Sequence, residues 1–303
     1  MTNLKTVLIG GGTGFIGTAL TNSLKHKGYV VKIISRKPGP INMTWTELEK
    51  TGIPSNTAAV VSMAGQNIFD MTRRWTPGFK QNVWSSRVNT TQGLANAIKK
   101  AAEKPTVFIS LSGVGYYKPC DKTEYSEDSP GGNFDFLSEL AANWENASKL
   151  DTPDCQNVRR VVIRSGVVVG RNGGVVQQMY WPFYFGVGGP VASGQQYFPW
   201  IHISDIVGLI VFAIENKNVD GIMNGVAPQV ISNKDFASAL GRAMWRPAIL
   251  PLPAFVLNAA FSEERAKIMT EGQKVIPKRT EELGYKFKYR DIDSACRECI
   301  RVT

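Results

Sequence analysis

Residues 11–17 read Gly11-Gly12-Thr13-Gly14-Phe15-Ile16-Gly17, and this glycine-rich stretch decides the fold. The apolar run at residues 7–9 precedes it, as expected of a strand buried on both faces of a parallel sheet. Leu20 and Leu24 follow at helical spacing, and Gly28 is placed to end that helix. The stretch therefore predicts a tight turn between a strand and a helix.

Such a turn is suited to a pyrophosphate. Glycines let the phosphate approach the backbone closely, and the helix N-terminus offers it unpaired N–H groups and a partial positive charge. A turn with a purely structural role is the alternative. The order strand, turn, helix and second strand favours a dinucleotide site. The residues predicted to contact the dinucleotide here are Gly11, Gly14, Phe15, Ile16 and Gly17.

The residues after the second predicted strand distinguish between the two nicotinamide cofactors. This strand, residues 29–34, is followed by Ser35, Arg36 and Lys37. An NAD site usually has Asp or Glu at this place, which binds the ribose 2′-hydroxyl and would repel a 2′-phosphate. Arg36 can form charge-assisted hydrogen bonds to that phosphate, and Ser35 can donate one more. A solvated basic turn is the alternative, but the position favours NADP(H) as the cofactor.

The composition is that of a globular protein of 303 residues with a net charge of +10. The basic residues are spread along the chain without a dense run, so we expect no nucleic-acid partner. No apolar run is long enough to span a bilayer. The first strand begins almost at once, which leaves no room for a signal or transit peptide. We expect a cytoplasmic protein, and mitochondrial import by an internal signal stays open.

The four cysteines are typical of a reducing compartment. Cys296 and Cys299 have the spacing Cys-x-x-Cys, but no second pair or nearby histidine completes a zinc site. They fall in a predicted helix, so we expect them to pack in its core and we expect no metal.

Strands and helices alternate along the first 170 residues, which predicts an α/β fold with a Rossmann-type, doubly wound parallel sheet. Further strands are expected at residues 57–65, 106–112 and 159–164, and helices at residues 45–50, 77–102 and 133–150.

After Gly170 the composition shifts toward glycine, proline and aromatic residues. We therefore expect three parts. Residues 1–170 form the NADP-binding domain, and residues 171–248 form a smaller C-terminal, substrate-side lobe interleaved with the last Rossmann elements. Residues 249–303 form a helical appendage.

Several motifs resemble those of the extended short-chain dehydrogenase/reductases, the superfamily of the nucleotide-sugar epimerases. These motifs lie at residues 11–17, 62–65 and 164–170. Longer stretches are similar to a narrower subgroup usually called "epimerase family protein" and lie at residues 188–190, 198–205, 223–228, 252–255 and 272–279. The resemblance covers essentially the whole chain. It implies an NADP-dependent oxidoreductase or epimerase that acts on an unassigned small-molecule substrate.

The resemblance also places contacts with the cofactor. The residues concerned are Ser35, Arg36, Met63, Ala64, Asn82, Arg87 and Val167. Ser35 and Arg36 match positions that meet the adenosine 2′-phosphate. Met63 and Ala64 match the turn beneath the adenine ribose and the pyrophosphate. Asn82 and Arg87 match polar positions on the following helix, although an exposed helix charge is the alternative for Arg87. Val167 matches the backbone near the nicotinamide.

The chain departs from the superfamily at the proton-transfer pair, Tyr-x-x-x-Lys, in which the lysine and the cofactor lower the tyrosine pKa. No tyrosine here has a lysine four residues later, and Phe136 or Leu137 stands near the expected tyrosine. Ser112 and Tyr117 are the remaining catalytic candidates, with packing as the alternative for Tyr117. A non-catalytic NADP(H)-binding sensor, or an assembly or scaffold protein with a protein partner, is therefore the alternative function.

Three other ionisable residues are candidates for chemistry. His202 lies in a run that leads into a helix, and we expect a structural histidine that anchors the junction with the lobe. Glu139 and Glu145 lie on the helix that lacks the tyrosine. We expect both to be charges on the helix surface, with Glu139 also able to face a cleft.

Overall fold

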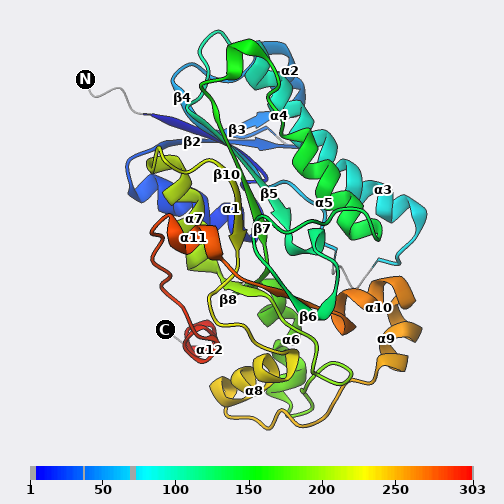
Figure 1. Ribbon diagram of the computed structural model, residues 1–303. Coiled ribbons are helices and arrows are strands. Elements are labelled where there is room, and N and C mark those ends of the chain that lie inside the picture. The colour runs from blue at the N-terminus through cyan, green and yellow to red at the C-terminus, as the bar shows by residue number, and fades with distance from the viewer. Residues whose placement is uncertain (1–4, 37, 69–72, 302–303) are drawn as a thin grey trace.

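A seven-stranded, fully parallel sheet forms the centre of the molecule (Figure 1). The structure is a computed structural model that describes residues 5–36, 38–68 and 73–301. The strand order is β10-β7-β5-β4-β1-β2-β3. The strands are β1 (Thr6–Gly10), β2 (Val30–Ser35), β3 (Asn42–Thr44), β4 (Thr57–Ser62), β5 (Val107–Gly113), β7 (Arg159–Ser165) and β10 (Gly221–Gly225). The order reverses between β1 and β4, where doubly wound sheets bind their ligands.

Helices cover both faces of the sheet, as a doubly wound fold requires (Figure 1). On one face, α1 (Phe15–His26) and α7 (Ile203–Glu215) pack on alternate residues of β1, including Val7 and Ile9. On the other face, Leu8 packs with residues of α2 (Trp45–Thr51) and α4 (Val88–Lys100). Each central strand is therefore buried on both sides, and the predicted fold class is confirmed.

The single helix predicted at residues 77–102 is wrong at its centre, where two helices meet. These are α3 (Pro77–Ser85) and α4, which begins at Val88. Ser86 stands at the break, and its Oγ accepts the backbone N–H of Gln66 at 2.9 Å and donates to the carbonyl of Val83 at 3.0 Å. The break is thus tied to the loop that follows β4, a tertiary contact that helical periodicity does not reveal.

A strand that the sequence analysis did not predict follows β5. It is β6 (Cys120–Tyr125), and it pairs in parallel with β11 (Gln273–Val275) near the end of the chain. Four of its six residues are exposed, so it lacks the alternating apolar residues by which strands are recognised.

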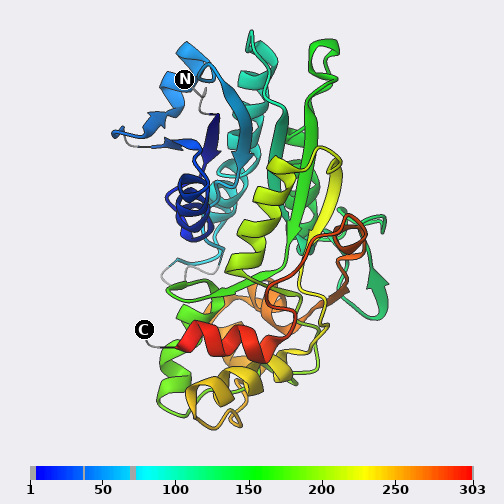
Figure 2. The same cartoon turned by 90° about the vertical axis from the view of Figure 1, so that its left-hand side faces the viewer.

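The remaining elements lie at the carboxyl ends of the sheet strands, apart from α11 (Lys278–Glu282), which packs beside β10. They are β8 (Val167–Gly170), α6 (Gly174–Tyr184), β9 (Trp200–His202), α8 (Asn233–Met244), α9 (Ala254–Phe261), α10 (Glu263–Thr270), α11 and α12 (Ile292–Ile300). Figure 2 shows α12, in red, beside α8, in yellow. Residues of α6, α8 and α12 share one hydrophobic core, in which Cys296 and Cys299 are buried. Helix α5 (Phe136–Ala147) covers the sheet beside α4 (Figure 1). No helix within the described residues is both long and apolar enough to cross a membrane.

Candidate functional site

The glycine-rich turn connects β1 to α1, and its glycines differ in whether the surrounding protein leaves room for a side chain. Gly11 has a φ of +89°, and a Cβ there would lie 2.7 Å from the backbone nitrogen of Ala64. A Cβ on Gly17 would lie 2.3 Å from the carbonyl oxygen of Gly11. At Gly14 the φ is −79°, and a Cβ would meet only the Gly11 oxygen at 3.5 Å. Packing explains the first two glycines, whereas the protein leaves room for a small side chain at Gly14.

Gly14 stands directly in front of the N-terminus of α1. Gly14 is the N-cap residue, no side chain caps the helix, and its first turn contains no acidic residue. The N–H groups of the first turn and the positive end of the helix dipole are therefore available to an anion. The donor set and the missing side chain at Gly14 fit a pyrophosphate.

Phe15 joins this turn to the start of α6. A Cβ on Gly173 would lie 2.2 Å from the Phe15 ring, and a Cβ on Gly170 would lie 2.9 Å from it. Phe15 thus packs against a glycine-rich connection. Val167 begins β8 nearby in the chain, but its N–H already donates to the Pro199 carbonyl at 2.8 Å. A contact between Val167 and a nicotinamide would therefore not come from that N–H.

The strand register brings the other predicted cofactor residues to the same edge of the sheet. Gly10 pairs with Ile34 on β2, so Ser35 and the exposed Arg36 follow beside the glycine turn. On the other side, the N–H of Met63 donates to the Gly10 carbonyl at 2.9 Å, and Ala64 touches Gly11. Lys37 lies outside the described residues.

Arg87 is half-buried beside the turn that follows β4, so an exposed helix charge is the wrong interpretation. A Cβ on Gly65 would lie 2.9 Å from its guanidinium carbon. The guanidinium donates to the Val83 carbonyl at 3.1 Å and lies 5.3 Å from the Trp144 ring centre. Burial lowers the pKa of Arg87 to about 10. No carboxylate of the described residues pairs with it, which suits a cation that meets a phosphate. Asn82 lies exposed on α3.

Apolar residues occupy the position at which the superfamily usually has its proton-transfer tyrosine. Phe136, at the start of α5, lies with its ring centre 5.7 Å from that of Trp75 and 6.4 Å from that of Trp84. The residues four positions after Phe136 and Leu137 are Leu140 and Ala141, and both are buried. None of these four residues has an ionisable side chain for proton transfer.

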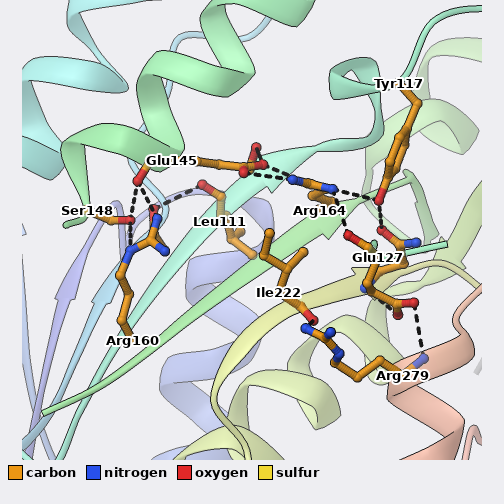
Figure 3. Close-up of polar contacts among 12 residues, drawn as sticks. Leu111, Tyr117, Glu127, Glu145, Ser148, Arg160, Arg164, Ile222 and Arg279 are labelled. Atoms are coloured by element: carbon orange, nitrogen blue, oxygen red, sulfur yellow. Dashed lines mark hydrogen bonds and ion pairs between the residues drawn. The ribbon is translucent and has the colours of Figure 1, made fainter. Parts of the chain in front are cut away.

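The two remaining catalytic candidates are enclosed by protein groups (Figure 3). Ser112 is buried, and its hydroxyl donates to Glu145 at 3.0 Å. Tyr117 is fully buried, and its hydroxyl donates to Asn224 at 2.8 Å and accepts from Arg164 at 2.8 Å. Burial raises the pKa of Tyr117 and outweighs the effect of the neighbouring Arg164 cation. Both hydroxyls are therefore buried and hydrogen-bonded to protein groups.

A buried ion pair organises this cluster, and it corrects the prediction for Glu145. The Glu145 carboxylate accepts two hydrogen bonds from Arg164, at 2.8 and 2.9 Å, and both residues are buried. The Arg164 guanidinium also lies 3.6 Å from the ring centre of Tyr116. Glu145 is therefore not a surface charge: it crosses from α5 to β7 and neutralises a buried cation. Glu139 lies exposed.

The same cluster binds the C-terminal segment to the sheet. Glu127 accepts the backbone N–H of Asn224, on β10, at 3.0 Å and that of Arg279, on α11, at 3.1 Å. The Asn224 side chain donates to the carbonyl of Ile276 at 2.9 Å. Figure 3 shows Glu127 between Arg164 and Arg279. A polar cluster thus fills the ends of β5, β7 and β10.

His202 is buried at the junction of β9 and α7, in the structural role predicted for it. Its Nδ1 accepts the N–H of Ser204 at 3.2 Å, and its Nε2 lies 2.9 Å from Glu298 on α12. Cys299 is close enough for the three side chains to be considered as metal ligands. However, Nδ1 accepts an N–H, so the ring proton sits on Nε2 and blocks that nitrogen. The arrangement suits a hydrogen bond to Glu298 better than a metal.

Comparisons with known proteins agree with this geometry. Residues 7–224 match the NAD dependent epimerase/dehydratase family, and residues 252–299 match a domain of unknown function, DUF1731. The chain is 50% identical to epimerase family protein SDR39U1 of Bos taurus over 97% of this chain and 99% of the relative. The corresponding figures for the Homo sapiens protein are 49%, 97% and 99%.

A solved structure shows the same fold. The crystal structure of human epimerase family protein SDR39U1 (isoform 2) with NADPH has a TM-score of 0.95 and 48% identity, and the match covers 97% of this chain and 99% of that one. The predicted resemblance is confirmed over the whole length. The chain belongs to the NAD dependent epimerase/dehydratase family, among the epimerase family proteins that are similar to SDR39U1 and carry a C-terminal DUF1731 domain.

Proposed function

We propose that this chain is an NADP(H)-dependent oxidoreductase. The observation that carries the proposal is the room left at Gly14 beside the uncapped N-terminus of α1, with Ser35 and Arg36 at the end of the next strand. The similar human protein, crystallised with NADPH, supports the same cofactor.

Different residues of this chain would bind different parts of the cofactor. The first turn of α1 would hold the pyrophosphate, and Ser35 and Arg36 would hold the 2′-phosphate. The turn at Met63 and Ala64 would lie under the adenine ribose. The half-buried Arg87 adds a cation beside Gly65, at the edge where the phosphates would lie. When bound, NADPH supplies a hydride.

The surroundings favour reduction over epimerisation. Epimerisation at a hydroxyl-bearing carbon needs a base that takes the hydroxyl proton and later returns it. Neither Phe136 nor Leu137 can act in this way, and the hydroxyls of Ser112 and Tyr117 are engaged. Reduction of an activated carbonyl needs one proton, which water can supply. We therefore propose an activated carbonyl compound as the substrate class.

The test is hydride transfer from NADPH that carries deuterium at C4, against a panel of α-dicarbonyls and enones, whose reduced products keep the transferred deuterium on carbon. We expect deuterium in at least one reduced product, at unchanged rate in Tyr117→Phe. If the protein binds NADPH but transfers no deuterium to any acceptor, the reductase proposal fails.

A second candidate function is favoured by the engaged hydroxyls. In this case the chain binds NADP(H) without turnover and acts as a sensor of the NADPH/NADP⁺ ratio or as an assembly partner. It predicts tight cofactor binding, no hydride transfer to the panel, and a protein partner whose affinity differs between the NADPH-bound and NADP⁺-bound forms. Pull-down with each form measures this difference, and equal capture by both would contradict it.

A further inference from the structure

The exposed large hydrophobic residues are concentrated on one part of the molecule. Of those that the structure describes, all but Val30 lie between residues 181 and 256. We name six of them the aromatic surface: Trp181, Tyr184, Phe185, Val187, Trp245 and Ile249. Trp181, Phe185, Trp245 and Ile249 are 61, 70, 89 and 76% exposed. They come from the end of α6 and from the connection between α8 and α9, at the end of the molecule opposite α2 (Figure 1).

Hydrogen bonds and packing contacts join these two segments into one surface. The Arg246 side chain donates to the Tyr184 carbonyl at 2.9 Å. A Cβ on Gly186 would lie 3.8 Å from Pro247, and the N–H of Leu252 donates to the Pro190 carbonyl at 2.9 Å. The rings from Tyr180 to Phe185 also contact one another, with ring centres 5.4 to 6.0 Å apart. The surface is therefore a structured patch.

Trp245 is the residue whose placement folding explains least. It ends α8 with a φ of 56° and a ψ of 41°, the left-handed conformation that normally favours glycine at a helix end. A tryptophan in this backbone conformation thus costs free energy, and its ring is left exposed to water. A buried environment for that ring in a complex would account for its presence.

The charge pattern identifies the occupant. Residues 172–201 and 247–262 contain no Asp, Glu, Lys or Arg, although the chain has a net charge of +10. A surface that binds an anionic membrane normally has several Lys and Arg residues around its apolar residues, whereas each of these two segments contains none and Arg246 directly precedes the second. An uncharged surface needs no complementary charge and can face a second copy of itself across a two-fold axis.

The area is also sufficient for a dimer. Fully exposed aromatic side chains present about 200 Å² each, so the six residues expose on the order of 800 Å². A standard protein–protein interface buries about 800 Å² per partner. We propose that the aromatic surface is an interface through which two copies of this chain form a symmetric dimer.

Analytical ultracentrifugation of the full chain over a range of micromolar concentrations tests the proposal. We expect a species of twice 33.3 kDa for the wild type and a monomer for Trp181→Glu and for Trp245→Glu. Val30→Glu adds the same charge at an exposed apolar site outside the surface and should remain a dimer. Thermal melts with NADPH check that each variant folds, and the cofactor should stabilise all of them equally.

Three results would overturn the proposal. The first is a wild-type monomer at every concentration. The second is a dimer that neither tryptophan substitution weakens, which would place the interface elsewhere. The third is a wild-type monomer that sediments with phosphatidylcholine–phosphatidylserine vesicles and loses this binding in Trp245→Glu, which would assign the surface to a membrane.

Discussion

At the scale of single residues, the glycines of the turn differ in whether the fold requires them or a ligand would. Gly11 and Gly17 are required because a Cβ would overlap neighbouring backbone atoms. Gly14 has an ordinary φ and room for a methyl group, so the protein itself does not require glycine there. A ligand that approaches the backbone closely, as proposed above, would account for glycine at this position.

This difference predicts opposite effects of two similar substitutions. Gly14→Ala should change the free energy of unfolding by less than about 1 kcal/mol, because its backbone and surroundings accept a methyl group. It should nevertheless weaken NADPH binding at least tenfold. Gly17→Ala should lower the free energy of unfolding by about 2 kcal/mol or more, since its Cβ would overlap the Gly11 carbonyl. Urea unfolding and calorimetric titration measure both quantities. Unchanged NADPH affinity in Gly14→Ala would remove Gly14 from the site.

The buried ion pair gives a second prediction at this scale. Glu145→Ala leaves the Arg164 cation buried without its partner, so the free energy of unfolding should fall by about 3–5 kcal/mol. Glu139→Ala removes an exposed carboxylate of the same helix and should change it by less than about 0.5 kcal/mol. Urea unfolding compares the two variants, and equal small effects would show that the pair contributes little.

At the scale of elements, long-range contacts determined what the sequence did not reveal. The strands of the sheet were predictable because each is a short continuous apolar run, and the helices because their apolar residues recur with helical spacing. The break between α3 and α4 was not, because it depends on Ser86 bonding to Gln66. Strand β6 was missed because its residues are polar and its partner β11 lies far along the chain. Glu145 was misplaced because Arg164 is on another element.

Helix α10 shows how the C-terminal segment can influence the candidate cofactor site. Arg265 is buried and donates to the carbonyls of Ile68 and Arg73, both at 2.8 Å, in the segment that follows the turn at Met63. Arg265→Met keeps much of the side-chain volume but leaves both carbonyls without these donors. We expect lower stability and severalfold weaker NADPH binding.

Lys267→Met is the matched control for Arg265→Met. Lys267 is exposed on the same helix, and its partner Glu263 is four residues earlier. This variant should resemble the wild type in melting temperature and in NADPH titration. If Arg265→Met binds NADPH as the wild type does, α10 has no effect on the cofactor site.

The junction of β9 and α12 predicts a pH dependence of stability. Burial lowers the pKa of His202 below its ordinary 6.5 and outweighs the Glu298 carboxylate. The unfolded chain then binds the proton more readily than the folded one, so stability is lost as the pH falls below about 6.5. His202→Gln should remove this part of the loss, whereas His26→Gln, at an exposed site, should not. Urea unfolding between about pH 5 and pH 7.5 measures the slopes, and identical slopes in both variants would contradict the assignment.

At the scale of the whole molecule, the candidate cofactor residues follow the regular order of the sheet, whereas the polar cluster at the ends of β5, β7 and β10 does not. Parallel strands end at one edge, so the sequence alone could place Gly11, Ser35 and Met63 together. No periodic pattern connects Ser112, Tyr117 and Arg164, whose hydrogen bonds join distant segments. The structure therefore supports a predictable dinucleotide site beside a polar cluster that only the folded chain reveals.

The central claim is that this site selects NADPH through Ser35 and Arg36. Calorimetric titration of NADPH and NADH into wild type, Arg36→Ala and Lys25→Ala tests it directly. Lys25 is exposed at the far end of α1, so its substitution removes the same charge away from the turn. We predict that the wild type and Lys25→Ala bind NADPH at least tenfold more tightly than NADH, and that Arg36→Ala loses most of this preference. Equal affinity of the wild type for both nucleotides, or an undiminished preference in Arg36→Ala, would contradict the claim.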